Sequence, residues 1–127
     1  MSDERTKILI VDDERNIREA IARYLALEGI EAHRAENGLA AQRLLSTESY
    51  AAAVVDLRMP EMGGLELLGW LRSEGLDTPV VMISAFGEIG DTSEANRLGA
   101  EDYIVKPFDP ADLVVRLKKI IEDKKKG

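Results

Sequence analysis

Charged side chains stand at the ends of three short apolar runs in this sequence. Asp12 and Asp13 follow the first run, Asp56 follows the third, and Lys106 follows the fifth. If these runs are strands of one open parallel sheet, their carboxyl ends lie along a single edge, so residues distant in the sequence meet there. Three carboxylates that face one ammonium form an acidic pocket suited to Mg²⁺ and a phosphoryl group.

Strand-like and helix-like hydrophobic patterns alternate five times along the chain, which predicts an α/β fold. The expected strands cover 7–11, 31–35, 52–55, 80–84 and 102–105. A helix is expected after each strand, the fourth over 88–98 and the last over 110–123. Gly29 is expected to end the first helix in the left-handed conformation, and Gly75 is expected to end the third helix. With right-handed crossovers these units build a doubly wound (βα)5 three-layer sandwich.

The composition fits one domain with a core of its own. The chain has 127 residues, of which 45% are hydrophobic, and it lacks an apolar run of membrane-spanning length. It contains no cysteine and no apolar signal segment after Met1, so we expect a cytoplasmic protein. The net charge of −7 opposes binding to nucleic acid phosphates, and we expect no direct contact with DNA or a membrane. Residues 1–123 are expected to form the domain, and 124–127 a basic tail or the start of a linker.

Four local motifs resemble those of a known family. They are Val11-Asp12-Asp13-Glu14, Asp56-Leu57-Arg58-Met59-Pro60, Ser84-Ala85 and Lys106-Pro107-Phe108. Together they resemble the receiver domain of two-component response regulators over nearly the whole chain. The resemblance implies a flavodoxin-like sheet with the strand order 2-1-3-4-5, which periodicity alone does not give. Parts of 59–68 and 98–108 are most similar to receivers attached to bacterial enhancer-binding transcription activators.

The resemblance makes Asp56 the residue that accepts a phosphoryl group from a sensor histidine kinase. Asp13 and Asp56 would bind Mg²⁺ directly, and Asp12 would act through a water molecule. The backbone carbonyl of Arg58 would complete the protein ligands. Without the ion the three carboxylates repel one another and favour protonation, so Mg²⁺ binding should weaken as the pH falls.

Three further groups would act on the phosphoryl oxygens by the same resemblance. Lys106 would contact one oxygen, while the Ser84 hydroxyl and the backbone N–H of Ala85 would donate to others. The peptide bond before Pro107 would be cis and would orient Lys106 towards the pocket. Such a domain assists its own phosphorylation and dephosphorylation without being a turnover enzyme.

Ser84 and Tyr103 would form the conformational switch that the resemblance implies. On phosphorylation the Ser84 hydroxyl would move towards the phosphoryl group and the Tyr103 ring would turn inward. This movement would alter the face made by the fourth helix, the fifth strand and the fifth helix, to which an output domain, a partner protein or a second copy would bind. The fourth helix contains Gly90 and several poor helix formers, so we hypothesise that it is partly mobile before phosphorylation.

Two bulky residues are expected to affect the lifetime of the phosphorylated state. Arg58 and Phe86 lie two positions beyond Asp56 and Ser84. In the family these positions flank the path of the hydrolytic water. Their size predicts slow self-dephosphorylation.

Each motif also has a simpler interpretation when it is taken alone. Asp13 could cap the first helix, Asp56 could belong to a turn, and Lys106 could lie in an ordinary loop. Two other functions stay open, namely an interaction module that is never phosphorylated and a Mg²⁺-dependent phosphatase. The phosphatase is disfavoured because Asp12 and Asp13 are adjacent and the chain has no room for a cap. A flavodoxin-like electron carrier is disfavoured because acidic residues after the first strand would repel its cofactor phosphate.

The sequence leaves several properties of such a domain undetermined. These are the cognate kinase, the signal, the downstream output and the oligomeric state. The chain could be a stand-alone regulator or the front part of a longer protein.

Overall fold

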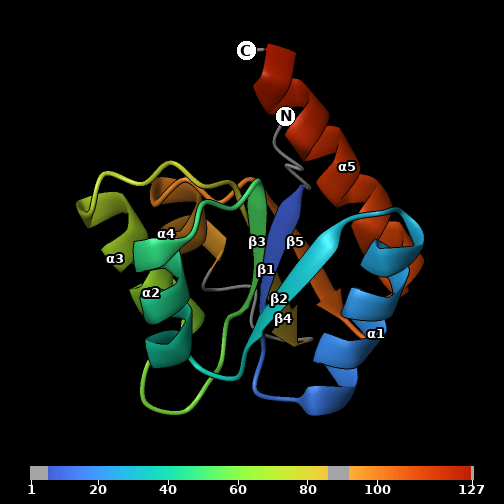
Figure 1. The fold of residues 1–127 in the computed structure, drawn as a ribbon. Coiled ribbons are helices and arrows are strands. Elements are labelled where there is room, and N and C mark those ends of the chain that lie inside the picture. Colours follow the sequence, from blue (N-terminus) through green and yellow to red (C-terminus); the bar gives the residue numbers. More distant parts are fainter. Residues whose placement is uncertain (1–5, 86–91, 127) are drawn as a thin grey trace.

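The computed structural model describes residues 6–85 and 92–126, which form three layers (Figure 1). A five-stranded sheet is the middle layer, with α1 and α5 on one face and α2, α3 and α4 on the other. The strands are β1 Lys7–Val11, β2 Glu31–Ala35, β3 Ala52–Asp56, β4 Val80–Ala85 and β5 Asp102–Lys106. The helices are α1 Arg15–Leu27, α2 Gly38–Thr47, α3 Gly64–Ser73, α4 Thr92–Arg97 and α5 Pro110–Lys126.

All five strands are parallel and lie in the order β2-β1-β3-β4-β5. This confirms the predicted doubly wound fold and its strand order. The chain starts inside the sheet with β1, moves outward to β2 and then returns past β1 to β3. At this change of direction α1 leaves β1 on one face and α3 leaves β3 on the other (Figure 1). In open α/β sheets such a point is where ligands bind.

Two apolar clusters, one on each face of the sheet, hold the layers together. From β1, Leu9 and Val11 pack in the cluster that includes residues of α2 and α3. Ile8 and Ile10 point the other way, into the cluster that includes residues of α1 and α5, and all four side chains are fully buried. Alternate residues of a strand face opposite sides, so a strand covered on both sides must be apolar throughout. The strand segments are therefore continuous apolar runs in the sequence.

Helices α1 and α3 end where their glycines predict. Gly29 and Gly75 have φ angles of 73° and 76°, in the left-handed region that favours glycine. Their N–H groups donate to the carbonyls of Ala26 and Arg72 at 3.0 and 3.1 Å. The predicted left-handed end at Gly29 is confirmed, and Gly75 ends α3 in the same conformation.

Helix α5 is longer than the sequence pattern predicts. It begins at Pro110, as expected, but continues through Lys126 rather than stopping at Asp123. Lysines in the last turn lie next to the unpaired carbonyls of the helix end, where positive charge is favourable. The lysines expected to form a tail or linker thus extend the helix, while the domain limit itself stays a prediction. Within 6–85 and 92–126 there is no helix with the length and apolar character needed to cross a lipid bilayer.

Within the described residues, helix α4 runs from Thr92 to Arg97. Ala95 of this helix is buried against the core, and Gly99, with φ at 86°, follows the helix end. The first part of the predicted helix, 88–91, lies outside the described residues together with Phe86. Its mobility before phosphorylation therefore stays a prediction.

Candidate functional site

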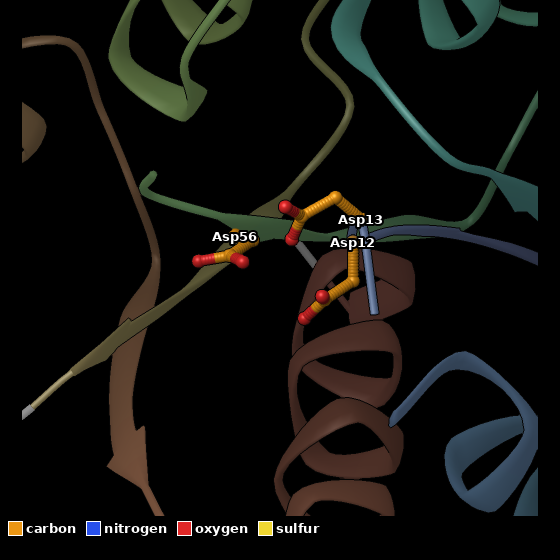
Figure 2. Close-up of side chains that lie close together, drawn as sticks. All are labelled: Asp12, Asp13 and Asp56. Carbon is orange, nitrogen blue, oxygen red and sulfur yellow. The ribbon is translucent and has the colours of Figure 1, made fainter. Parts of the chain in front are cut away.

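Three aspartates from two neighbouring strands converge at the carboxyl edge of the sheet. Asp12 and Asp13 follow β1, and Asp56 is the last residue of β3. The last residue of β1 pairs with the residue before Asp56, so the two strand tips lie side by side. One carboxylate oxygen from each aspartate lies within 4.8 Å of the others. Figure 2 shows the three side chains gathered around a common space.

The three carboxylates differ in their access to solvent. Asp12 is fully buried and Asp56 is 4% exposed, whereas Asp13 lies at the surface. The N–H of Glu14 donates to Asp12 Oδ1 at 2.8 Å, and the N–H of Arg58 donates to Asp56 Oδ1 at 3.3 Å. Asp12 Oδ2 is buried without a hydrogen-bond partner among the described residues. Its ion pair with Lys106 Nζ is long, at 3.5 Å, so this buried carboxylate oxygen can accept a further cation.

Burial changes the acidity of the two inner carboxyl groups. Loss of solvent, reinforced by the charge of Asp12, raises the pKa of Asp56 to about 6 despite the opposing effects of Lys106 and the Arg58 N–H. Burial likewise raises the pKa of Asp12, although the Glu14 N–H and Lys106 oppose it. The inner pair therefore favours protonation more than free aspartates do. A bound divalent cation would favour the ionised forms instead.

Lys106 faces the acidic pocket from the tip of β5. Its Nζ lies 3.2 Å from Asp56 Oδ2 and 3.5 Å from Asp12 Oδ2. The peptide bond between Lys106 and Pro107 is cis, as the resemblance implies. Partial burial disfavours the ammonium, but the nearby carboxylates outweigh this effect and raise the pKa of Lys106. The lysine consequently stays charged at neutral pH.

Two residues of the site received no role from the sequence. Glu14 Oε1 accepts a hydrogen bond from Lys106 Nζ at 2.8 Å, and Arg18 Nη1 donates to the carbonyl oxygen of Asp12 at 2.7 Å. Glu14 was detectable as a third acid at the same strand tip, whereas a bond from Arg18 to a backbone carbonyl leaves no sequence pattern. Glu14 is also the N-cap residue of α1, so the alternative that Asp13 caps this helix is wrong.

The loop after Asp56 returns tightly to the sheet. A Cβ atom on Gly64, the first residue of α3, would lie 2.4 Å from the carbonyl oxygen of Asp56 and 2.8 Å from Met82 Cε. The N–H of Gly64 donates to the carbonyl of Leu57 at 2.9 Å. Only glycine fits this approach, which fixes the start of α3 against the backbone that carries Asp56.

Ser84 and Tyr103 lie on the neighbouring strands β4 and β5. Ser84 is buried, one residue beyond the partner of Asp56 in the sheet. Tyr103 is half-buried and pairs with Met82, and its hydroxyl donates to the side-chain oxygen of Asn96 in α4. Residues two apart on a strand share a face, so Ser84, two residues after Met82, points to the same side as Tyr103.

The remaining predicted site residues border the acidic pocket. Ala85 ends β4 and pairs with Lys106. Arg58 is exposed two residues after Asp56, and its N–H contacts the Asp56 carboxylate. Phe86 lies outside the described residues. The structure thus brings the three aspartates and Lys106 together and places Ser84 and Ala85 on the neighbouring strand tip.

The donor atoms at this site fit a hard divalent cation. Mg²⁺ prefers carboxylate oxygens, uses few protein ligands and retains several waters. Asp12 and Asp56 supply buried oxygens, and the exposed Asp13 leaves a solvent side for water or a phosphoryl oxygen. The arrangement can hold Mg²⁺ and present one carboxylate to an incoming phosphorus atom.

Comparison with known proteins gives a consistent family. Residues 8–118 match the response regulator receiver domain. The transcriptional regulatory protein SrrA of Staphylococcus aureus is 44% identical over 115 residues, which are 91% of this chain and 47% of SrrA. The chain therefore spans about half the length of this relative.

Solved structures of receiver domains share the fold over nearly all of the chain. The receiver domain of Francisella response regulator 1452 has a TM-score of 0.88 and 31% identity, covering 94% of this chain and 99% of its own. The chemotaxis protein CheY4 of Vibrio cholerae has a TM-score of 0.85 and 28% identity, covering 92% and 99%. A particular similarity to receivers of enhancer-binding activators stays a prediction. The sequence match, the shared fold and the gathered strand tips agree, and the chain belongs to the response regulator receiver domain family.

Proposed function

We propose that Asp56 accepts a phosphoryl group from the phosphohistidine of a sensor histidine kinase, with Mg²⁺ as cofactor. Receiver domains are signalling domains that work with such kinases and with output domains. The observation that carries the proposal is the position of Asp56. Its nearly buried carboxylate lies among two other aspartates and 3.2 Å from the ammonium of Lys106.

The transfer needs little beyond a nucleophile and fixed positive charge. An Asp56 oxygen forms a bond to phosphorus while the phosphorus–nitrogen bond breaks, and the histidine nitrogen keeps the electron pair. Only the ionised carboxylate is nucleophilic, and with a pKa of about 6 Asp56 is ionised at neutral pH. Lys106 would follow the charge to a phosphoryl oxygen, while the Ser84 hydroxyl and the Ala85 N–H would donate to the others.

The acidic residues divide the metal-binding role between them. Asp13 and Asp56 would hold Mg²⁺ directly, Asp12 would act through a water molecule, and the Arg58 carbonyl would complete the set. Asp12 Oδ2 accepts no hydrogen bond from the described residues and has only a 3.5 Å ion pair with Lys106, which supports a further cation at this place. Bound Mg²⁺ supplies positive charge that offsets the charge of the phosphoryl group.

Phosphorylation would alter the face formed by α4, β5 and α5. Ser84 would move towards the phosphoryl group and the Tyr103 ring would turn inward behind it. The bond between Tyr103 and Asn96 supports this output because it links β5 to α4 in the unphosphorylated domain. An output domain, a partner protein or a second copy of the chain would bind the altered face.

The stoichiometry of phosphate separates this function from phosphatase activity. With a small phosphodonor and Mg²⁺, we expect no more than one phosphoryl group on each chain and none on Asp56→Asn. Continuous phosphate release that needs Asp12 but not Asp56 would show a phosphatase instead. Failure of the wild type to accept any phosphoryl group would show an interaction module that does not use its acidic site.

The size of Arg58 is expected to lengthen the phosphorylated state. Arg58 is exposed two residues after Asp56, and a side chain of this size near the phosphoryl group would hinder an attacking water. Arg58→Asn should therefore lose its phosphoryl group several-fold faster than the wild type, about three- to tenfold if the barrier falls by about 1 kcal/mol. The check is the decay of intact phosphoprotein mass after removal of the donor, and equal decay rates would contradict the prediction.

A further inference from the structure

Lys106 has a carboxylate partner that the proposed phosphoryl transfer does not use. Its Nζ lies 2.8 Å from Glu14 Oε1, closer than to Asp56 Oδ2 at 3.2 Å or Asp12 Oδ2 at 3.5 Å. The Glu14 side chain is 59% exposed, whereas that of Asp56 is 6% exposed. The ammonium therefore lies between one outer carboxylate and two inner ones.

The backbone holds Glu14 in place opposite this lysine. Its N–H donates to Asp12 Oδ1 at 2.8 Å, and its carbonyl accepts the N–H of Arg18 at 3.1 Å as α1 begins. In the sheet, β1 and β5 are separated by β3 and β4. The contact between Glu14 and Lys106 therefore connects the segments that follow β1 and end β5 across the carboxyl edge of the sheet. Both residues also line a groove of about 450 Å³ between the start of α1 and Pro107. The exposed Glu14 side chain thus stands at the solvent side of the pocket.

The lysine can both assist and obstruct the chemistry at Asp56. An ammonium paired with Asp56 Oδ2 competes with a metal ion for this carboxylate and lowers its reactivity towards phosphorus. If the Lys106 ammonium moved away from Asp56 and found no other carboxylate, it would be a partly buried charge without a partner, which is unfavourable. Glu14 lowers this cost because it offers an outer carboxylate at hydrogen-bond distance from the ammonium.

We propose that Glu14 is a positioning residue that competes with Asp56 for the Lys106 ammonium at the mouth of the acidic pocket, and so makes Asp56 more available to a divalent cation and a phosphodonor. The inference rests on the proposed function of Asp56. After transfer, the same lysine can leave Glu14 for a phosphoryl oxygen without a change in backbone structure.

The test is a double-mutant cycle read out by Mg²⁺ binding. The dissociation constant is measured by NMR titration of the Arg58 N–H, which contacts Asp56 Oδ1, in the wild type, Glu14→Gln, Lys106→Met and the double variant. Glu14→Gln should raise the constant about three- to fivefold, the range of an exposed ion pair. In the Lys106→Met background the same change should have less than a twofold effect.

A matched control measures the direct effect of removing one negative charge. Glu61→Gln removes an exposed carboxylate from the loop after Asp56 and should change the constant by less than twofold. Glu14→Asp keeps the charge but shortens the side chain, so it should also weaken Mg²⁺ binding, and only when Lys106 is present. Equal effects of Glu14→Gln in both backgrounds, or no effect in the wild type, would overturn the proposal.

Failure of this inference can be distinguished from failure of the proposed function. Labelling of the wild type by a small phosphodonor is measured separately from the Mg²⁺ cycle. Labelling together with additive effects in the cycle would remove only the role of Glu14. Coupling without any labelling would support the positioning of Lys106 and remove the phosphoryl-acceptor role of Asp56.

Discussion

Burial gives Asp56 an acidity unlike that of a surface aspartate. The raised pKa, about 6, arises mainly from loss of solvent and then from repulsion by Asp12. The folded domain therefore carries an unfavourable charge at neutral pH when no cation is bound. A residue selected for stability alone would be neutral here, so the ionised carboxylate indicates a functional requirement.

The pH dependence of stability should report this unfavourable charge. The folded-state pKa of Asp56 lies above its ordinary value of 3.8, so its contribution to stability is full below about pH 4 and is lost as the pH rises through about 6. Asp56→Asn cannot ionise, and without metal it should gain stability over the wild type by on the order of 2 kcal/mol between pH 4 and pH 7.5. Urea unfolding of both proteins in a chelating buffer measures this gain. A difference that stays constant with pH would contradict it.

At the residue scale, the charged residues that follow the apolar runs predicted where the site lies, but they did not predict all of its contacts. Asp12, Asp13, Asp56 and Lys106 follow apolar runs, and the parallel sheet brings such residues to one edge. The contact from Glu14 depends on side-chain conformations across 92 residues of sequence, which no local pattern encodes. That Asp12 Oδ2 accepts no hydrogen bond from the described residues likewise emerges only when the atoms around it are placed.

At the scale of single elements, the start of α3 positions Asp56 through a glycine. A methyl group on Gly64 would overlap the Asp56 carbonyl, so Gly64→Ala should destabilise the domain by about 2–4 kcal/mol. Gly69, in the middle of the same helix, has no described atom within 4 Å of the place that a methyl group would occupy, and Gly69→Ala should stabilise by about 0.5–1 kcal/mol. Thermal unfolding of both variants tests this pair. Similar effects of the two substitutions would contradict the close approach at Gly64.

Arg72 connects α3 to the loops at the opposite edge of the sheet. Its guanidinium donates to the carbonyls of Leu98 and Gly99 after α4, at 2.9 and 3.1 Å. It also donates to Leu76 and Thr78 in the loop before β4, at 3.0 and 3.1 Å. One planar side chain therefore fixes two loops, including the one that leads from α4 to β5.

Replacement of this guanidinium should loosen both loops. Arg72→Lys keeps the charge but cannot span four carbonyls, so it should lower the free energy of unfolding by about 2 kcal/mol. Arg43→Lys, at an exposed position on α2, is the matched control and should change it by less than about 0.5 kcal/mol. Urea unfolding decides the comparison, and equal effects at both arginines would show that the carbonyl contacts contribute little.

Element limits were less predictable from the sequence than element types. The predicted third, fourth and fifth strands stop one residue early, because the apolar pattern ends before Asp56, Ala85 and Lys106 while the hydrogen-bonded strand includes them. Helix α5 continues past its apolar stripe because lysines are good helix formers at a carboxyl end. The apolar pattern shows only how far the apolar side chains extend, whereas backbone pairing continues one residue further and includes the buried Asp56.

At the scale of the whole molecule, topology turns distant residues into one site. Periodicity predicts five strand–helix units but leaves their order in the sheet open, and the order 2-1-3-4-5 came from the family resemblance. This order places β3 between β1 and β4, so the aspartate at its tip has neighbours on both sides. The chain spans about half the length of SrrA. That an output domain or partner protein binds the face of α4, β5 and α5 is accordingly a proposal.

The most direct measurement is the site and extent of phosphorylation. The protein is incubated with a small phosphodonor and Mg²⁺, its intact mass is recorded, and the modified residue is mapped, with Asp56→Asn and Lys106→Met in parallel. The account predicts one phosphoryl group per wild-type chain, located on Asp56, none on Asp56→Asn and little labelling when Mg²⁺ is removed. A wild-type protein that stays unmodified in excess donor and Mg²⁺, or that is modified equally after Asp56→Asn, would contradict it.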